Sequence, residues 1–421
     1  MNGRRVKWGA ALGCLIACFV IGCRVPKLEL KQPVAVKGKV TDQTFRDSLG
    51  GAVRTPFFAG NRVTPLVNGD QFVPAIVSAI RSATNSVNIE TFIWKSGRMS
   101  DQILGALIER AGAGVEVRVV ADGLGTYRLT KDDRKRMEAA GIKFIRMNPP
   151  RLTQLHRINF RDHRKLVIVD GRVAFTGGFC IGDKWLGNAE TEALWRDTLV
   201  QVEGPVVAQF QGVFAANWLA GTGEMLFGEK FYPPLDLKGT ALAQHFSTGA
   251  RDNRGAAHLV YVSAIEAARH RIILEQSYFV PDDLALEALL RARERGVDVQ
   301  IITPGKINFN IVRRASRTLW PKLLRAGVQI YEYGPAKLHC KILIVDGAFV
   351  SIGSVNFDER SFRINDEQNV NIIDSDFATR MEVQFERDRA QSRVVNLNDL
   401  KKTPWHLRAF EWFTALFRPQ L

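Results

Sequence analysis

Two copies of a short polar pattern carry the residues best suited to catalysis. Both copies follow the spacing H-x-K-x4-D, with His163, Lys165 and Asp170 in the first and His339, Lys341 and Asp346 in the second. All three residues recur at one constant offset, and a glycine follows each copy at the same distance, at Gly177 and Gly353. A single H-x-K would carry no weight, but two copies at one offset do not arise readily by chance.

These residue types suit the transfer of a phosphodiester. Residues i and i+2 of a strand share a face, so the histidine and lysine of each copy point the same way. If the copies pack about a pseudo-twofold axis, two imidazoles and two ammonium groups surround one phosphate. One imidazole then attacks phosphorus, the other protonates the leaving alkoxide, and the lysines stabilise negative charge. We expect Asp170 and Asp346 to be catalytic, with a structural role at the strand-to-turn corner as the alternative.

The elements that position both copies recur in one order. Helical periodicity and short apolar runs predict a helix, a strand, a second helix and two further strands before each copy. They span residues 72–83, 87–94, 101–113, 115–120 and 141–145 in the first half, and 258–268, 272–279, 284–295, 297–302 and 327–331 in the second. Strands that alternate with helices are typical of α/β folds. We therefore predict two pseudo-symmetric α/β sandwich lobes that face each other across one active-site cleft.

The charge and both ends of the chain indicate a membrane setting. The 421 residues carry a formal net charge of +15, which favours nucleic acid or an anionic membrane surface as partner. After a basic start, an uncharged apolar run over 8–22 ends at a Cys23 box that resembles the cleavage site of bacterial lipoproteins. We expect a lipid anchor on Cys23 or, alternatively, an uncleaved N-terminal anchor, at a cell-envelope membrane. The tail over 405–421 suits an interfacial membrane helix, or packing on the protein's own core.

The cysteines and histidines do not predict a metal site. Outside the N-terminal segment only Cys180 and Cys340 remain, too few for a disulfide framework. No cluster of cysteines and histidines has the spacing of a zinc site. We therefore expect no metal and no cofactor.

From about residue 63 to 374 the motifs resemble the phospholipase D superfamily. In the second half the resemblance extends to Ser354, Asn356 and Glu367, which implies two phosphate-contacting residues and a carboxylate that orients His339. In the first half Trp195-Arg196-Asp197 matches the corresponding segment, which implies that Asp197 orients His163. Gly178 and Cys180 stand where Ser354 and Asn356 stand in the second half, so we expect unequal half-sites. The family also implies that His163 is the nucleophile, a choice that the residues alone leave open.

Within the superfamily, the resemblance is strongest to bacterial cardiolipin synthases. It rests on motifs such as Leu66-Val67-Asn68-Gly69, Asp162-His163-Arg164-Lys165 and Tyr278-Phe279-Val280-Pro281. This branch implies a phosphatidyltransferase that joins two phosphatidylglycerols, or a related donor, through a phosphohistidine. A phospholipase D hydrolase that releases phosphatidic acid, a metal-independent nuclease and a lipid-binding envelope protein with a decayed site are the alternatives. The membrane tether and apolar tail argue against nucleic acid as a partner, while protein partners stay open.

The resemblance also divides the chain into five segments. They are a lipoprotein-type signal peptide over 1–22, a membrane-proximal segment over 23–62, a first phospholipase D-like lobe over 63–238, a second over 239–395 and a basic aromatic tail over 396–421. Phospholipids are the expected substrates of the two lobes together.

Overall fold

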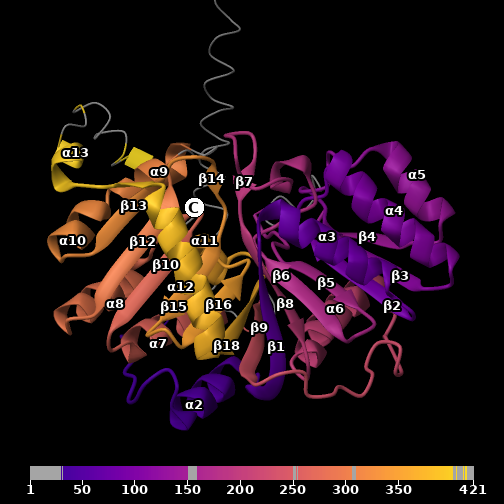
Figure 1. Ribbon diagram of the computed structural model, residues 1–421, viewed down its shortest axis with the longest axis horizontal. Helices are drawn as coiled ribbons and strands as arrows, with labels where there is room; N and C mark the ends of the chain where they lie inside the picture. Colours follow the sequence, from indigo (N-terminus) through magenta and orange to yellow (C-terminus); the bar gives the residue numbers. More distant parts are fainter. Residues whose placement is uncertain are drawn as a thin grey trace, which may run out of the picture.

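The computed structural model shows one broad sheet whose faces are covered by helices (Figure 1). It describes residues 30, 32–149, 159–249, 253, 255–305, 310–401, 404, 411, 413 and 414. After α2 (Gln43–Val53), the first half contains β1 (Phe58–Val67), α3 (Asn68–Arg81), β2 (Ser86–Thr91), α4 (Arg98–Gly112), β3 (Glu116–Asp122), α5 (Lys131–Ala139), β4 (Lys143–Met147), β5 (Lys165–Val169), β6 (Val173–Gly177), η2 (Asp183–Trp185), β7 (Trp195–Arg196), β8 (Thr198–Glu203) and α6 (Val207–Thr222).

The second half repeats much of this order. It contains β9 (Ala241–Thr248), α7 (Ala256–Ala267), β10 (Arg271–Gln276), β11 (Phe279–Val280), α8 (Asp283–Glu294), β12 (Asp298–Pro304), α9 (Asn310–Arg317), α10 (Trp320–Arg325), β13 (Gln329–Tyr333), β14 (Lys337–Leu338), β15 (Lys341–Val345), β16 (Phe349–Gly353), β17 (Phe357–Asp358), α11 (Glu359–Arg363), β18 (Glu367–Ile373), α12 (Ser375–Ala390), β19 (Ser392–Val394) and α13 (Leu397–Lys401). Each element predicted before the two motifs is present, with its ends shifted by a few residues.

The two halves of the sheet read alike outward from its middle. β1 and β9 pair antiparallel at the centre. On one side follow β8, β6, β5, β2, β3 and β4, and on the other β18, β16, β15, β10, β12, β13 and β19. Each motif strand therefore lies between two antiparallel neighbours, β6 and β2 for β5, and β16 and β10 for β15. The α/β class is confirmed, and the halves share one continuous sheet.

Alternate residues of the motif strands fill cores on opposite faces of the sheet. On one face Leu166 and Ile168 of β5 join Ile342 and Ile344 of β15 in a single hydrophobic cluster with residues of α6 and α12. On the other face Val167 packs with α3 and α4, and Leu343 packs with α7 and α8. This period of two is that of a strand buried on both sides. The shared cluster holds the two halves together beneath the site.

Residues from about 40 to 62, which the sequence assigns to the membrane-proximal segment over 23–62, pack into the folded protein. Phe45, Leu49 and Val53 of α2 are buried in the same cluster as α7 and α8. The ring of Phe45 lies edge-on to that of Phe349, with centroids 6.3 Å apart. β1 starts at Phe58 and occupies the centre of the sheet. The apolar spacing in α2 therefore serves the core of the second half.

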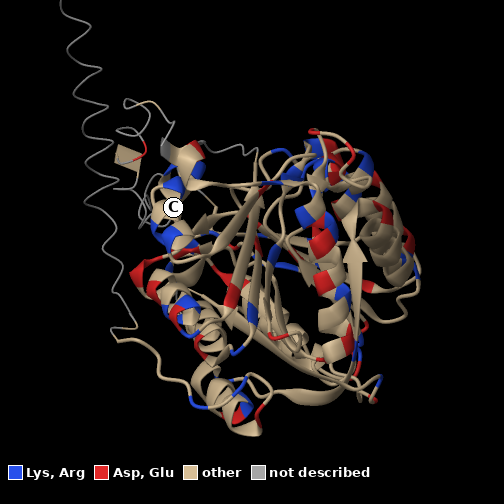
Figure 2. Cartoon of the chain, turned by 60° about the vertical axis from the view of Figure 1, so that its left-hand side comes forward, with Lys and Arg blue, Asp and Glu red and all other residues tan. Residues whose placement is uncertain are grey.

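Charges of both signs are interspersed over the outer helices, while the strands are mostly uncharged (Figure 2). The excess of Lys and Arg over Asp and Glu is thus spread over the surface in this view. Net charge alone consequently does not locate a binding site, and the buried charges near the motifs are more informative.

Candidate active site

Both motif strands begin at the place where the two halves meet. β5 starts at Lys165 and β15 at Lys341, and each motif histidine lies two residues earlier in the chain. β7 and β14, near the upper edge in Figure 1, pair in parallel across the halves, with Lys337 opposite Trp195. This pairing brings the first residues of the second motif against the segment that precedes Asp197.

His163 is held by a carboxylate. Its Nδ1 atom lies 2.9 Å from both carboxylate oxygens of Glu367. Because an ionised carboxylate only accepts hydrogen bonds, Nδ1 carries the proton and Nε2 keeps its lone pair. Burial lowers the pKa of His163 to about 4, so the imidazole is neutral at pH 7. A neutral ring with a fixed tautomer is what nucleophilic attack requires.

His339 is held in the same way, in a more aromatic setting. Its Nδ1 atom lies 2.9 Å from Oδ2 of Asp197. The indole rings of Trp185 and Trp195 lie against the imidazole, with centroid distances of 5.4 and 4.9 Å. Burial, followed by the charges of Lys341 and Lys337, lowers the pKa of His339 well below its ordinary value. His339 is therefore also neutral in the unliganded protein.

The carboxylates are exchanged between the two halves, so the predicted pairing is wrong. Glu367, expected beside His339, binds His163, and Asp197, expected beside His163, binds His339. The cause is backbone pairing across the halves. The His339 N–H donates to the Arg196 carbonyl at 2.7 Å, and the His163 N–H donates to the Asp366 carbonyl at 2.9 Å. Each histidine thus lies beside the residue that precedes the other half's carboxylate.

The two motif lysines lie against the histidines. Nζ of Lys341 donates to the carbonyl oxygen of His339 at 2.7 Å and lies 3.3 Å from each of its ring nitrogens. Nζ of Lys165 donates likewise to the carbonyl of His163. Burial lowers the pKa of Lys341 to about 8, and Lys165 acts in the same direction, against Asp197. Since Lys165 and His163 also act electrostatically on His339, the structure brings all four groups together.

Glu367 is the more strongly stabilised of the two carboxylates. It also accepts hydrogen bonds from Ser354 Oγ at 2.5 Å, Ser361 Oγ at 2.8 Å and Asn365 Nδ2 at 3.2 Å. Burial alone would raise the pKa of Glu367, but His163, Lys165 and the Ser354 hydroxyl hold it below its usual value. Burial raises the pKa of Asp197 to about 6, against Lys341 and the Trp185 N–H. The half-sites therefore differ in how firmly each carboxylate keeps its charge.

Gly178 supports the site through its lack of a side chain. A Cβ at this position would lie 2.6 Å from Oδ1 of Asp197 and 2.6 Å from the carbonyl oxygen of His339. Its counterpart Ser354 uses its hydroxyl to bind Glu367. Both residues, expected near the phosphate, thus act on the carboxylates in the unliganded protein.

Asp170 and Asp346 hold turns, so their catalytic prediction is corrected. Asp170 accepts hydrogen bonds from the N–H groups of Thr84, Asn85 and Ser86. Asp346 accepts from those of Arg269, His270 and Arg271. Each follows the last residue of a five-residue motif strand, about 17 Å from the lysine at roughly 3.3 Å per residue. That separation places both carboxylates too far from the histidines to touch a common phosphate.

Asn356 and Cys180 occupy equivalent positions with different capacities. Asn356 is 4% exposed, and its Oδ1 atom has no hydrogen-bond partner within the described part of the chain, while its NH2 group is a full hydrogen-bond donor. Burial raises the pKa of the Cys180 thiol, against the nearby Lys165, so the group is protonated at pH 7. A thiol is a weak donor. The second half therefore offers the stronger additional donor for a phosphate.

Sequence reasoning missed Trp185 and Lys337 as residues of the site. Trp185 lies in η2, and its Nε1 donates to Oδ2 of Asp197 at 3.0 Å. Lys337 is 6% exposed and lies two residues before His339. The alternation that places His339 and Lys341 on one face also applies to Lys337. That signal was available, whereas nothing in the local sequence marks Trp185.

Cys23 and most of the C-terminal tail lie outside the described residues. The lipid anchor and the interfacial helix therefore stay predictions. Among the residues that the structure does describe, none of the helices combines the length and the apolar character needed to cross a membrane.

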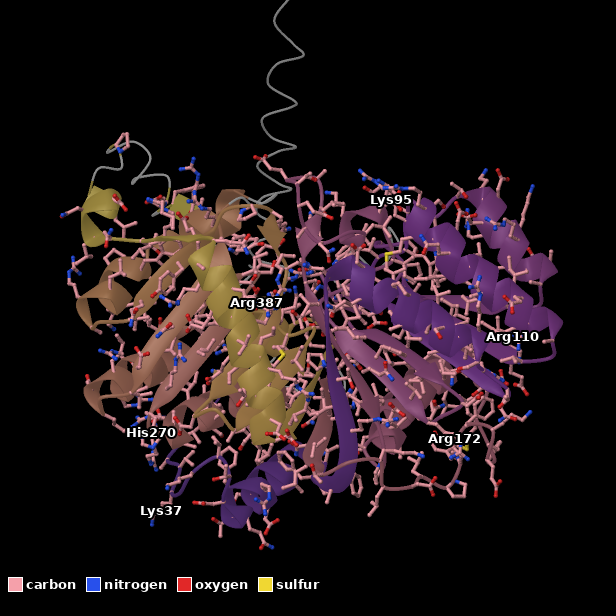
Figure 3. All side chains as sticks on the ribbon, viewed as in Figure 1. Lys37, Lys95, Arg110, Arg172, His270 and Arg387 are labelled. Atoms are coloured by element: carbon pink, nitrogen blue, oxygen red, sulfur yellow. The ribbon has the colours of Figure 1, made fainter. Side chains whose placement is uncertain are left out.

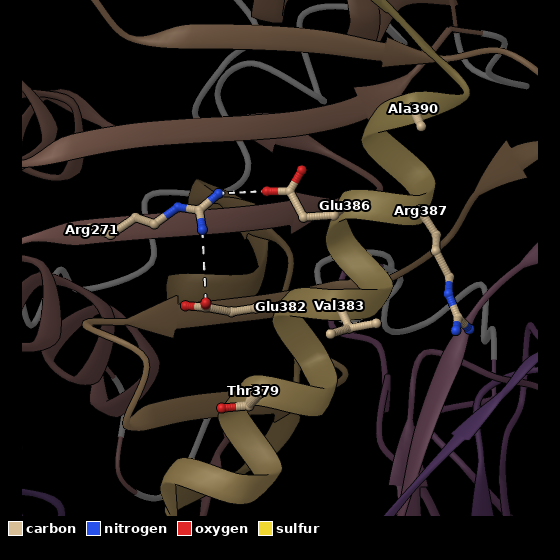
Figure 4. A pocket seen from close by; sticks show the side chains of 7 residues that line it. All are labelled: Arg271, Thr379, Glu382, Val383, Glu386, Arg387 and Ala390. Atoms are coloured by element: carbon tan, nitrogen blue, oxygen red, sulfur yellow. Dashed lines mark hydrogen bonds and ion pairs between the residues drawn. The ribbon is translucent and has the colours of Figure 1, made fainter.

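An open pocket of about 530 Å³ lies along α12 (Figure 4). It is lined by Arg271, Thr379, Glu382, Val383, Glu386, Arg387 and Ala390. Arg271 pairs there with Glu386 at 2.8 Å and with Glu382 at 3.7 Å. Since opposite charges already neutralise each other in this pocket and no histidine or lysine of the motifs lines it, we assign it no part in the chemistry.

Comparisons with known proteins agree with this geometry. Residues 76–218 and 261–389 match the family described as "Cardiolipin synthase, PLD-like domain". The chain is 37% identical over 357 residues to cardiolipin synthase A of Pseudomonas fluorescens (strain Pf-5), across 83% of this chain and 73% of that protein. It is 33% identical over 401 residues to the cardiolipin synthase of Geobacillus kaustophilus (strain HTA426), across 94% and 80%.

A solved structure shares the fold at low sequence identity. Phosphatidylserine synthase of Haemophilus influenzae Rd KW20 aligns with a TM-score of 0.66 and 14% identity, over 90% of this chain and 100% of that one. This likeness concerns the fold alone, while the family match and the two relatives cover most of the sequence. The chain belongs to the cardiolipin synthase branch of the phospholipase D superfamily.

Proposed function

We propose that this protein is a phosphatidyltransferase that makes cardiolipin from two phosphatidylglycerols, or from a related donor, through a covalent phosphohistidine. The observation that carries the proposal is the pair of imidazoles, one buried and one largely buried, each with Nδ1 on a carboxylate and with a lysine ammonium beside it. The names of the relatives support the choice of phospholipid substrates.

In the first step Nε2 of His163 attacks the phosphorus of the donor. A P–N bond forms, the P–O bond to glycerol breaks, and His339 gives its Nε2 proton to the leaving oxygen. The anionic phosphodiester raises the pKa of the imidazole beside it, so that His339 is protonated when the donor is bound. We assign the nucleophile to His163 because Glu367, with its lowered pKa, keeps the negative charge that stabilises a cationic phosphoimidazole.

In the second step the hydroxyl of an acceptor phosphatidylglycerol attacks the phosphohistidine. Nε2 of His339 takes the hydroxyl proton, the new P–O bond forms, and the P–N bond breaks. Lys165, Lys341 and the Asn356 amide stabilise the charge on the non-bridging oxygens. The phosphate-contacting roles of Ser354 and Gly178 are here indirect, through the carboxylates that they support.

The test is to incubate the purified protein with phosphatidylglycerol and separate the products by thin-layer chromatography. Cardiolipin and free glycerol are expected in equal amounts. Phosphatidic acid as the sole product would show a hydrolase instead. With donor radiolabelled in its phosphate, enzyme denatured in alkali, where the P–N bond of phosphohistidine is stable, should carry label on His163, and label on His339 would reverse the assignment of the two histidines.

We further propose that the N-terminus holds this activity at the cell-envelope membrane through a lipid on Cys23. The sequence of the Cys23 box supports this, with an uncleaved N-terminal anchor as the alternative. Cells grown with radiolabelled fatty acid should label the wild-type protein but not a Cys23→Ala variant. An unlabelled wild-type protein that still sediments with membranes would support the alternative.

A further inference from the structure

Two lysines gather on the Trp195 ring beside His339. Nζ of Lys337 lies 4.2 Å from the ring centroid and Nζ of Lys184 lies 4.8 Å from it. The imidazole of His339 lies 4.9 Å from the same ring. The ring therefore holds two cations next to the histidine to which we assign proton transfer.

Lys337 is a buried cation without a carboxylate. It is 6% exposed, and it forms no ion pair with any residue that the structure describes. Among the described residues, the contacts that offset its charge are aromatic rings, since the Tyr278 centroid lies 5.5 Å away in addition to that of Trp195. Burial, together with Lys341 and Lys184, lowers the pKa of Lys337 to about 7. At pH 7 the amine is therefore only partly protonated, and an anion bound beside it would raise its pKa and bring out the full positive charge.

The equivalent cation of the first half is neutralised. Arg161 lies two residues before His163, as Lys337 lies two residues before His339. Arg161 is paired with the buried carboxylate of Asp122 at 3.2 Å. The uncompensated charge is thus specific to the His339 side of the site, where the proposed mechanism activates the acceptor.

The position of Lys337 matches the spacing of the phosphates in the expected product. In cardiolipin a three-carbon glycerol bridge separates two phosphates by roughly 7 Å when extended. The Lys337 ammonium and the His339 imidazole lie 4.2 and 4.9 Å from the centroid of the same Trp195 ring, so the two groups can be no farther apart than the sum of these distances. An acceptor whose hydroxyl meets His339 therefore places its own phosphate near Lys337.

We propose that Lys337 and Lys184, held by Trp195, bind the phosphodiester of the acceptor phospholipid while its glycerol hydroxyl attacks the phosphohistidine. This inference rests on the proposed function and adds a second phosphate subsite to it. Water and free glycerol carry no phosphate, so the subsite favours transfer to phosphatidylglycerol over hydrolysis. Lys337 contributes the buried charge, and Lys184, which is exposed, guides the headgroup at the entrance.

The experiment measures how the phosphohistidine is partitioned among acceptors. The full-length protein is given phosphatidylglycerol in detergent micelles, and the ratio of cardiolipin to phosphatidic acid is measured for wild type, Lys337→Gln and Lys184→Gln. Loss of a charged hydrogen bond to the acceptor should lower this ratio about tenfold in Lys337→Gln. In Lys184→Gln the ratio should fall about threefold, because the exposed charge is screened. Lys337→Arg should restore most of the ratio.

Soluble acceptors separate recognition of phosphate from recognition of the lipid. Wild type should transfer to sn-glycerol 3-phosphate in preference to glycerol, and Lys337→Gln should lose most of that preference. The matched control is Lys37→Gln. This variant removes an exposed positive charge at the lower edge of the molecule (Figure 3). The ratio of cardiolipin to phosphatidic acid in Lys37→Gln should equal that of wild type. If it falls as far as in Lys337→Gln, the effect depends only on the net charge of the protein, and the subsite is refuted.

Two failures can be told apart. If the wild-type protein forms no cardiolipin at all, the proposed function fails and the subsite fails with it. If wild type forms cardiolipin but Lys337→Gln and Lys184→Gln, both folded by circular dichroism, lose the two products in proportion, the function stands and the subsite is refuted. Lys184→Gln keeps the test valid even if replacement of the buried Lys337 prevents folding.

Discussion

A Glu367→Gln substitution probes the exchange of carboxylates between the halves. The change keeps the shape of the side chain and removes its negative charge. Glu367 accepts from His163 Nδ1 at 2.9 Å and from the hydroxyls of Ser354 and Ser361. A hydrogen bond to a charged group contributes about 1.5–3 kcal/mol. At 1.36 kcal/mol for each factor of ten, formation of the phosphohistidine should slow by about 10- to 150-fold.

The assay compares two donors that differ in leaving group. Glycerol needs a proton to leave, whereas p-nitrophenolate does not, so a nitrophenyl donor bypasses the general acid. With this donor His339→Ala and Asp197→Asn should regain most of the wild-type rate of nitrophenolate release in the first turnover, because His339 is still needed as the base of the second step. His163→Ala and Glu367→Gln should stay slow, because the nucleophile is impaired whatever the leaving group.

The rates of the two histidine variants with the nitrophenyl donor decide which result would refute the exchange of carboxylates. If Glu367→Gln is rescued together with His339→Ala, Glu367 acts through His339 and the exchanged pairing is wrong. The comparison holds whichever histidine is the nucleophile, since each carboxylate variant is matched to a histidine variant. Unchanged thermal midpoints for all four proteins exclude general unfolding as the cause.

Three further outcomes are expected. Because burial raises the pKa of Asp197 to about 6, protonated Asp197 no longer accepts a hydrogen bond from His339 below that pH. The kcat/KM for phosphatidylglycerol should therefore fall as the pH drops through about 6. In Asp197→Asn this acidic limb of the pH profile should be absent. Asp346→Ala removes the acceptor of three backbone N–H groups and should lower the free energy of unfolding by about 2–3 kcal/mol. The turnover per folded molecule should stay that of wild type. If turnover is lost while stability is unchanged, Asp346 has a catalytic role. Gly178→Ala forces a Cβ against Asp197 and should cut kcat about 100-fold, while Gly212→Ala, with nothing within 4 Å, should not.

The elements before each motif could be predicted because their apolar residues follow one simple period. β5 and β15 are uninterrupted apolar runs, and the helices before them have a buried stripe. The central strands were missed for the opposite reason. β18 has the sequence EQNVNII, and its buried Gln368, Asn369 and Asn371 are paired within the sheet. Polar residues satisfied by hydrogen bonds leave no hydrophobic pattern to read.

The motifs in the sequence identified the candidate site, but they did not predict which carboxylate pairs with which histidine. His163 and Asp197 belong to the same half of the chain, 34 residues apart, and His339 and Glu367 belong to the other half, 28 residues apart, which favours pairing within each half. The backbone bonds His339 N–H to Arg196 O and His163 N–H to Asp366 O reverse this. Such contacts depend on how the halves meet at β1 and β9, and no local spacing encodes that geometry. Asp170 and Asp346 were misassigned because a turn-binding carboxylate and a catalytic one look alike in sequence.

The exchange of carboxylates also bears on how such a chain arises. A half expressed alone would retain its histidine but lose the carboxylate that fixes the tautomer of that histidine. It would also expose β1 or β9 as an unpaired edge strand that can pair with other chains. Two identical copies of an ancestral half would solve both problems at once, since twofold symmetry gives each copy the acid of its mate. Fusion of the copies would then free the two sides to diverge, and the difference between Lys337 and the Asp122-paired Arg161 at the equivalent position is of the kind that such divergence allows.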